Sequence, residues 1–137
     1  MKILGVDFGE RRTGIAVSDA LGITAQGVKT IFESDYKITA EKVLDELKTQ
    51  GAEKIVLGLP KNMDGSVGFR GEATLKFKEY LETLTDAKII LWDERLTTVS
   101  AIRTLNETNV RGKKRKNVID TVAATYILQG YLDSLSL

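Results

Sequence analysis

The sequence contains no cysteine and no histidine among its 137 residues. The absence of cysteine excludes disulfides, thiolate metal ligands and a cysteine nucleophile, and it fits a reducing compartment such as the cytoplasm. The absence of histidine excludes a Ser-His-Asp triad, histidine zinc sites and the usual general base near neutral pH. Any catalysis must therefore depend on carboxylates, lysine, tyrosine, hydroxyls or a metal ion bound by oxygen atoms.

Proline is nearly absent as well, and no apolar run is long enough to suggest a membrane span. Pro60 is the only proline, and we find no linker or repeat, so residues 1–137 are expected to form a single domain. Hydrophobic residues make up 42% of the chain, which is enough for a core at this length. The short apolar N-terminus favours a first strand over a signal peptide. We therefore expect a cytoplasmic protein with no membrane partner.

Neither sign of charge dominates, since 20 basic and 19 acidic residues give a net charge of +1. The total charge does not indicate nucleic-acid binding, but its distribution is more informative. Arg11 and Arg12 are adjacent, and a basic cluster occupies residues 111–116, where a loop containing Gly112 is expected. Such a cluster can bind phosphate, although runs of this kind are often only solvated loops. Its members are Arg111, Lys113, Lys114, Arg115 and Lys116.

Alternating or continuously apolar segments predict five strands. The first three follow one another closely, as antiparallel hairpins do, and the last two are continuously apolar, which is typical of strands buried on both faces. Helices precede both of the later strands, which implies right-handed parallel crossovers. The expected fold is therefore α/β, with a mixed five-stranded sheet flanked by helices. The strands are expected at residues 2–8, 13–19, 23–31, 54–60 and 88–92.

Apolar residues at helical spacing predict four helices. The first stops at Gly51, the third begins after a cap at Thr97 or Thr98, and the last begins after a cap at Asn117. The residues expected to face inward are Ile38, Val43, Leu44 and Leu47 in the first helix, Ala73, Phe77, Leu81 and Leu84 in the second, Val99, Ile102 and Leu105 in the third, and Val118, Val122, Tyr126 and Tyr131 in the last.

Two acidic residues lie at the ends of predicted strands. Asp7 stands in the apolar segment ILGVDF, where an unpaired charge is costly. It is either a metal ligand or, more simply, a partner of turn amides or of the neighbouring arginines. Glu94 follows the last strand, at the edge of the sheet where open α/β folds place their sites, or else it pairs with Arg95. Because strand neighbours point to opposite faces, only one of Asp93 and Glu94 can share a pocket with Asp7.

A third acid, Asp120, is expected in the first turn of the last helix, where it would complement the helix dipole. That structural role is sufficient for a lone residue. However, Asp120 is spaced with Ala123, Ala124 and Ile127 on a flank that looks buried. The alanines would let the helix lie close to the sheet and bring Asp120 near Asp7.

Together, the three acids form a candidate site for Mg²⁺ or Mn²⁺, which prefer carboxylate and water oxygens. Two such ions about 3.5–4 Å apart can activate water and stabilise the leaving oxygen in phosphodiester hydrolysis. The glycine-rich loop that precedes the second helix offers amides and Arg70 for phosphate contact, unless it is a plain surface turn built on Asp64-Gly65.

Four segments, taken together, resemble the YqgF family, which is also called RuvX. They occur in order, span nearly the whole chain and are highly specific in combination. The segments are DFGERRTGIAVSD from Asp7, GLPKNMDGSVGFRG from Gly58, DERLTT from Asp93 and RKNVIDTVAATYILQGYL from Arg115. One departure is Glu10, where many family members have a basic or neutral residue.

This resemblance implies an RNase H-like fold, in agreement with the predicted order of strands and helices. It also implies a nuclease whose acidic triad is Asp7, Glu94 and Asp120, with Asp93 as a less favoured ligand. Family members are described as Holliday-junction resolvases and as nucleases that mature the 5′ end of pre-16S rRNA. The expected partner is therefore an rRNA precursor or branched DNA, and junction resolution would call for a homodimer because two matched cuts are needed.

Two functions of other classes stay open. The segment DFGERRTGIAVSD resembles the first phosphate loop of actin-like phosphotransferases in the same superfamily. Those enzymes usually need two such domains, so a chain of this length would have to act as a dimer. The other alternative is a non-catalytic nucleic-acid or ribosome-assembly binding protein. The presence of all three acids argues against that alternative.

Overall fold

The structure is a computed structural model that describes residues 1–96 and 112–135, and for residues 112–120 it describes the helix backbone alone. Strands and helices follow one another in the expected order, and the predicted third helix lies in residues 97–111, outside the described residues. The elements are β1 (Lys2–Asp7), β2 (Arg12–Ser18), β3 (Ala25–Phe32), α1 (Tyr36–Thr49), β4 (Ala52–Leu59), α2 (Phe69–Leu84), β5 (Lys88–Asp93), the 3-10 turn η1 (Glu94–Leu96) and α4 (Gly112–Leu135).

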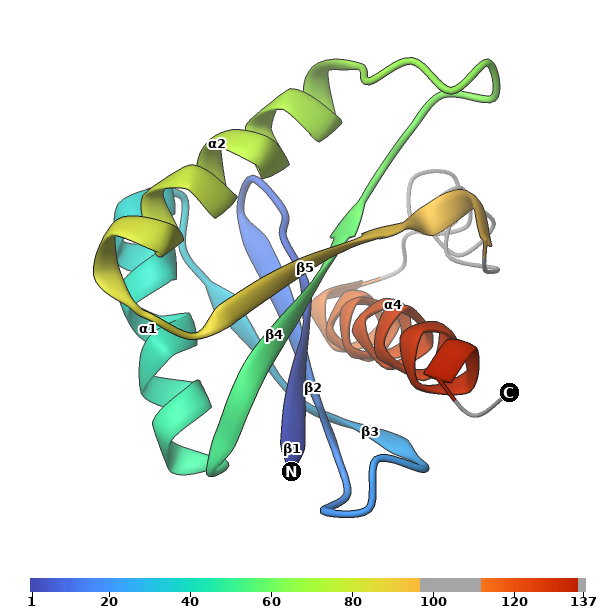
Figure 1. Cartoon of the computed structure of the whole chain (residues 1–137). Coiled ribbons are helices and arrows are strands. Elements are labelled where there is room, and N and C mark those ends of the chain that lie inside the picture. Colours follow the sequence, from blue (N-terminus) through green and yellow to red (C-terminus); the bar gives the residue numbers. More distant parts are fainter. Residues whose placement is uncertain (97–111, 136–137) are drawn as a thin grey trace.

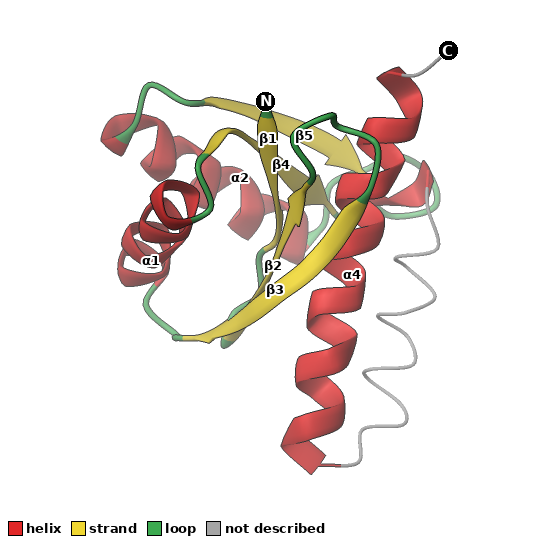
Figure 2. Cartoon of the chain, turned by 90° about the horizontal axis from the view of Figure 1, so that it is seen from below, coloured by secondary structure: helices red, strands yellow, loops and turns green. Residues whose placement is uncertain are grey.

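The five strands form one mixed sheet in the order β3-β2-β1-β4-β5. β1 pairs antiparallel with β2, and β2 with β3, because short turns join these strands as consecutive hairpins. β4 and β5 run parallel to their neighbours, because a helix crosses over before each of them. α1 and α2 cover one face of the sheet and α4 covers the other (Figure 1, Figure 2). The predicted mixed five-stranded sheet is therefore confirmed.

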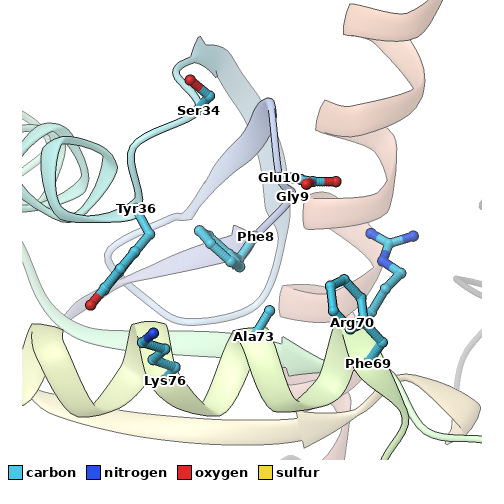
Figure 3. Close-up of a pocket in the computed structure, with 9 residues that line it drawn as sticks. All are labelled: Phe8, Gly9, Glu10, Ser34, Tyr36, Phe69, Arg70, Ala73 and Lys76. Atoms are coloured by element: carbon cyan, nitrogen blue, oxygen red, sulfur yellow. The ribbon is translucent and has the colours of Figure 1, made fainter.

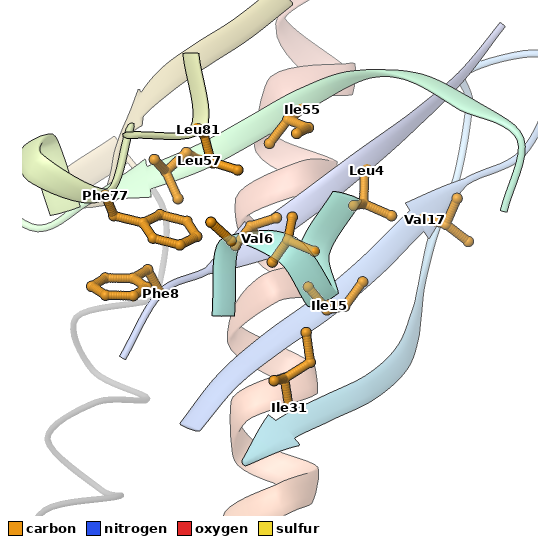
Figure 4. Packing of buried hydrophobic residues seen from close by; sticks show 12 residues of the cluster. Leu4, Val6, Phe8, Ile15, Val17, Ile31, Ile55, Leu57, Phe77 and Leu81 are labelled. Carbon is orange, nitrogen blue, oxygen red and sulfur yellow. The ribbon is translucent and has the colours of Figure 1, made fainter. Parts of the chain in front are cut away.

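Alternation along the strands divides the core into two layers. On the side of α1 and α2, Val6 of β1 and Phe8, which directly follows β1, pack with Phe77 and Leu81 of α2 (Figure 4). The rings of Phe8 and Phe77 stack with their centroids 4.2 Å apart. Because successive residues of a strand point to opposite faces, Asp7, between Val6 and Phe8, faces α4.

The helix α4 lies very close to the other face of the sheet. A Cβ atom on Gly5 of β1 would lie 2.7 Å from Leu128 Cβ and 3.1 Å from the carbonyl oxygen of Ala124. Ala123 and Ala124 are buried at the same interface, with 2% and 0% of their surface exposed. The expectation that alanines let this helix approach the sheet is confirmed, and the missing side chain of Gly5 supplies the matching space in the strand.

Burial differs from the prediction at several helix positions and in β5. Ile38, Leu84 and Tyr126 are 40%, 42% and 47% exposed, and Ala73 is also exposed, although all four were expected to face inward. In α1 the smaller Ala40 is buried against the sheet instead. The small side chain lets the helix lie close to the sheet and leaves the larger Ile38 side chain partly exposed at the edge of the interface. β5 was expected to be buried on both faces like β4, but it is an edge strand and is only half-buried.

The start of α4 also corrects the prediction. The helix is already formed at Gly112, whereas it was expected to begin after Asn117. The basic residues 113–116 therefore belong to a helix and not to a loop, and Asp120 is about two turns inside the helix instead of in its first turn. Lysine and arginine are good helix formers, and their propensity outweighs a single capping signal. No helix in the described part of the chain is long and apolar enough to cross a membrane.

Candidate active site

The first candidate residue, Asp7, ends β1 and is 4% exposed. It belongs to the row of β1 residues that faces α4, since Ile3 packs against that helix and Gly5 lies under Leu128. Its partner in the neighbouring strand β2 is Gly14, which has no side chain to fill the space beside the carboxylate. The structure thus buries the Asp7 carboxyl group between the sheet and α4.

The second candidate residue, Glu94, directly follows β5 and is 2% exposed. Its Oε2 atom lies over Gly58 of β4, because a Cβ atom on Gly58 would be only 2.6 Å from it. Gly58 comes one position after Leu57, which pairs with Val6, so Gly58 lies beside Asp7 in the parallel β1–β4 register. Asp7 and Glu94 therefore lie on the same face of the sheet, at the carboxyl ends of β1 and β5, and both border Gly58.

Asp93 does not belong to this pair of buried acids. Arg95 donates hydrogen bonds from Nη2 to Asp93 Oδ2 at 2.7 Å and from Nε to both carboxylate oxygens at 3.1 Å. These hydrogen bonds lower the pKa of Asp93. The pKa of Asp64, in the β4–α2 loop, is lowered first by the hydroxyl of Ser66 and also by the charge of Arg95. Arg95, proposed from the sequence as a structural partner of Glu94, thus pairs with Asp93 and lies near the loop.

The third candidate residue, Asp120, is placed by its position on the helix alone, since its side chain is outside the described residues. Counting back along α4, Asp120 comes one turn before Ala124 and two turns before Ile127, and those residues approach Gly5 and Gly58 of the sheet. No group of three metal-binding acids occurs among the side chains that the structure describes. Its role as a third ligand therefore stays a prediction.

The predicted phosphate-binding arginines gather at the same end of the sheet. Arg11 and Arg12 follow Asp7 in the turn into β2, and Arg70 lies in the first turn of α2, just beyond the loop that follows β4. Arg11 and Arg70 are exposed and Arg12 is half-buried. For the rest of the predicted basic surface, Arg111 and the side chains of Lys113, Lys114, Arg115 and Lys116 lie outside the described residues.

A feature that sequence reasoning missed is a cleft of about 590 Å³ on the opposite face of β1 (Figure 3). It was missed because its walls come from three separate segments and because Ala73, which lines it, was assigned to the core. The adjacent Phe69 and Arg70, an aromatic ring beside a cation in the segment that was predicted as a glycine-rich loop, were the signal available in the sequence. The lining residues are Phe8, Gly9, Glu10, Ser34, Tyr36, Phe69, Arg70, Ala73 and Lys76.

Comparison with known proteins identifies the family. A sequence model described as "RuvX: Holliday junction resolvase" matches residues 1–134. The chain belongs to the RuvX family. A RuvX relative from Staphylococcus carnosus is 51% identical over 137 residues, which cover 98% of this chain and 96% of the relative. A second, from Acetivibrio thermocellus, is 48% identical over 136 residues with the same coverage. Both are described as "Putative pre-16S rRNA nuclease".

Solved structures agree with the RuvX assignment at the level of the fold. The match to RuvC of T. thermophilus, solved in complex with Holliday junction substrate, covers 99% of this chain and 97% of the RuvC chain, with a TM-score of 0.60 at 11% identity. The match to the fowlpox virus Holliday junction resolvase covers 98% of this chain and 99% of the resolvase chain, with a TM-score of 0.52 at 18% identity. The predicted RNase H-like fold is confirmed, and the family is one of nucleases, hydrolases that act on phosphodiester bonds, as predicted.

Proposed function

We propose that this chain is a metal-dependent endonuclease that hydrolyses phosphodiester bonds in structured nucleic acid. The observation that carries the proposal is the pair of buried carboxylates, Asp7 and Glu94, beside Gly58 at the carboxyl ends of β1 and β5. Membership of the RuvX family supports the same activity. Two acids buried on one face repel each other unless a cation or hydrogen-bond donors compensate their charge.

The donor set fits Mg²⁺ or Mn²⁺. These ions prefer carboxylate and water oxygens, and a chain without histidine or cysteine offers oxygen ligands almost exclusively. Asp7 and Glu94 would hold the ion, and Asp120 would complete the acidic triad. When bound, divalent ions at such a site activate water and stabilise the leaving oxygen, and two ions share these tasks in many nucleases.

The other residues at this end of the sheet would position the nucleic acid. Arg11, Arg12 and Arg70 would bind phosphates on either side of the bond that is cut, and the basic residues 113–116 of α4, together with Arg111, would add to this surface. Gly58 would keep the space over β4 open, so that the Glu94 carboxylate can stay beside Asp7. Because phosphate contacts position a strand without reading its bases, we expect recognition of shape more than of sequence.

We infer that the activity is 5′-end processing of a pre-16S rRNA precursor, Holliday-junction resolution, or both. The description of the bacterial relatives supports the first activity, and that of the family supports the second. Junction resolution requires two matched cuts and therefore a symmetric homodimer. Processing of a single rRNA end does not.

A cleavage assay with both substrates side by side tests the proposal. Purified protein is incubated with Mg²⁺ and either a four-way DNA junction or a 5′-extended rRNA precursor, with the Asp7→Asn protein as the control. Cleavage of one substrate by the wild type and not by the control is the expected result. Cleavage of neither substrate with Mg²⁺ or Mn²⁺, together with binding that acid replacement leaves unchanged, would instead support a non-catalytic binding protein.

A further inference from the structure

The cleft that sequence reasoning missed lies on the face of β1 opposite Asp7. The β1–β2 turn, the β3–α1 connection and the first half of α2 form its walls (Figure 3). Three aromatic side chains contribute to them, namely Phe8, Tyr36 and Phe69. The ring of Phe69 is accessible, since this residue is 83% exposed. A volume of about 590 Å³ is in the range of sites that bind small organic groups and is sufficient for one nucleotide.

Positive charge accompanies these rings. Arg70 and Lys76 line the cleft, and Lys76 Nζ lies 5.3 Å from the centroid of the Tyr36 ring. Glu10 is the single acid among the described residues that line the cleft, and it lies on the β1–β2 turn. Proteins bind single-stranded nucleic acid with this combination, because every base can stack on an aromatic ring while cations hold the backbone phosphates.

The cleft is adjacent to the candidate active site in the chain as well as in space. Asp7 and Phe8 are consecutive, and strand alternation directs the first toward α4 and the second toward α2. Gly9 then turns the chain so tightly that a Cβ atom there would overlap the carbonyl oxygen of Arg12. A nucleic-acid strand that passes over this turn therefore reaches the acids on one side and the cleft on the other.

We propose that this cleft binds one unpaired nucleotide of the substrate strand, next to the phosphate that is cut. The base lies against the exposed ring of Phe69, and its phosphate lies against Arg70 and against Lys76, which stands over the Tyr36 ring. This inference rests on the proposed nuclease function and specifies its substrate class, a strand with an unpaired segment at the cleavage site. A uniform duplex cannot place a base in the cleft without unpairing it.

Binding to defined oligonucleotides tests the cleft. Fluorescence anisotropy is measured with a labelled single-stranded oligoribonucleotide and with a fully paired duplex of the same sequence, in an Asp7→Asn background so that neither probe is cut. Phe69→Ala should weaken binding of the single strand about tenfold, as expected for one lost stacking contact, and change duplex binding less than twofold. The matched control is Phe32→Ala, which removes a phenylalanine that is 53% exposed on β3, outside the cleft.

The salt dependence separates stacking from phosphate contact. Lys76→Ala should reduce the slope of log affinity against log salt by about 0.7 on the single strand, the contribution of one phosphate contact, whereas Phe69→Ala should leave the slope unchanged. Glu10→Gln should tighten binding, because it removes the acid from the cleft. Lys48→Ala, at the far end of α1, controls for general loss of positive charge.

Three results would overturn the proposal. They are single-strand binding that Phe69→Ala leaves unchanged, an equal loss of single-strand and duplex binding, and complete displacement of the oligonucleotide by micromolar mononucleotide, which would indicate a small-molecule site instead. Because binding is measured without cleavage, a wild-type protein that cuts neither substrate would count against the nuclease proposal alone.

Discussion

Replacing Gly58 with alanine is the most direct perturbation of the candidate active site that leaves every acid in place. The added Cβ atom would lie 2.6 Å from Glu94 Oε2, whereas ordinary van der Waals contact begins at 3.4 Å, so the carboxylate would have to retreat by about 0.8 Å. The same atom would overlap Ile127 of α4. Overpacking of this kind typically costs about 1–3 kcal/mol of folding stability.

The effect on catalysis should exceed the effect on folding. Misplacement of a reacting group by about 1 Å can reduce the rate roughly 100-fold, so Gly58→Ala should reduce the cleavage rate by about that factor. The rate is measured with saturating Mg²⁺ and substrate at a temperature where thermal unfolding shows the variant to be folded. In Gly58→Ala/Ile127→Val, the valine lacks the Cδ1 atom of Ile127 that overlaps most with the added Cβ, so stability should partly return while the rate stays low.

Gly5→Ala is the matched control, because it also pushes α4 away from the sheet but does not touch Glu94. Its Cβ atom would lie 2.7 Å from Leu128 Cβ, so a comparable loss of stability is expected. Cleavage by Gly58→Ala within threefold of the wild-type rate would refute the placement of Glu94 in the active site. An equal loss of rate in both variants would assign the effect to the helix and not to the acid.

Four further outcomes are expected. Asp7→Asn, Glu94→Gln and Asp120→Asn should each abolish cleavage and retain nucleic-acid binding, whereas Asp93→Asn should be milder; wild-type cleavage by any of the first three would remove that acid from the triad. Activity should require Mg²⁺ or Mn²⁺, with little turnover in Ca²⁺, and full activity in excess chelator would contradict a metal site. Hydrogen bonds from the neighbouring arginine lower the pKa of Asp93, so the stability they contribute is present above the unfolded pKa of about 3.9 and is lost as pH falls through the folded value. Urea unfolding at pH 7 and pH 3 should therefore show that the free energy of unfolding falls less between these two pH values in Asp93→Asn than in the wild type. Alanine at the three lysines between residues 113 and 116 should flatten the salt dependence of binding by about 0.9 per lost phosphate contact on duplex DNA, and an unchanged slope would show that these lysines do not meet phosphate.

The sheet could be predicted from the sequence because its signals are local. An apolar segment marks β1, a continuous apolar run marks β4, and short turns between the first strands fix antiparallel pairing. That only one of Asp93 and Glu94 can share a site with Asp7 could also be predicted, because successive residues of a strand point to opposite faces of the sheet. Arg95 was harder to place, because Asp93 and Glu94 are both acids within two residues of it, and only the structure shows that its hydrogen bonds go to Asp93.

The helix faces and the cleft could not be predicted in the same way. Helical periodicity finds a stripe of large apolar residues, but α2 packs through Gly71 and Thr74 as well as Phe77, and small or polar residues add nothing to that stripe. The cleft joins Tyr36 and Lys76, which are far apart in the sequence and meet only because α2 crosses back over the sheet. Its existence depends on helix placement, which no local pattern encodes.

The gathering of Asp7, Glu94 and the neighbouring arginines at one end of the sheet follows from the direction of β1. This strand is antiparallel to β2 and parallel to β4, so it forms the boundary between the hairpin half and the crossover half. Its carboxyl end therefore meets the carboxyl ends of β4 and β5, which deliver Gly58 and Glu94, and also the turn that carries Arg11 and Arg12. Open α/β sheets place their sites at such a change of direction, because the connections on the two sides diverge there and leave space. Asp7, as the last residue of β1, stands at that boundary, so its position follows from the topology as much as from its own local sequence.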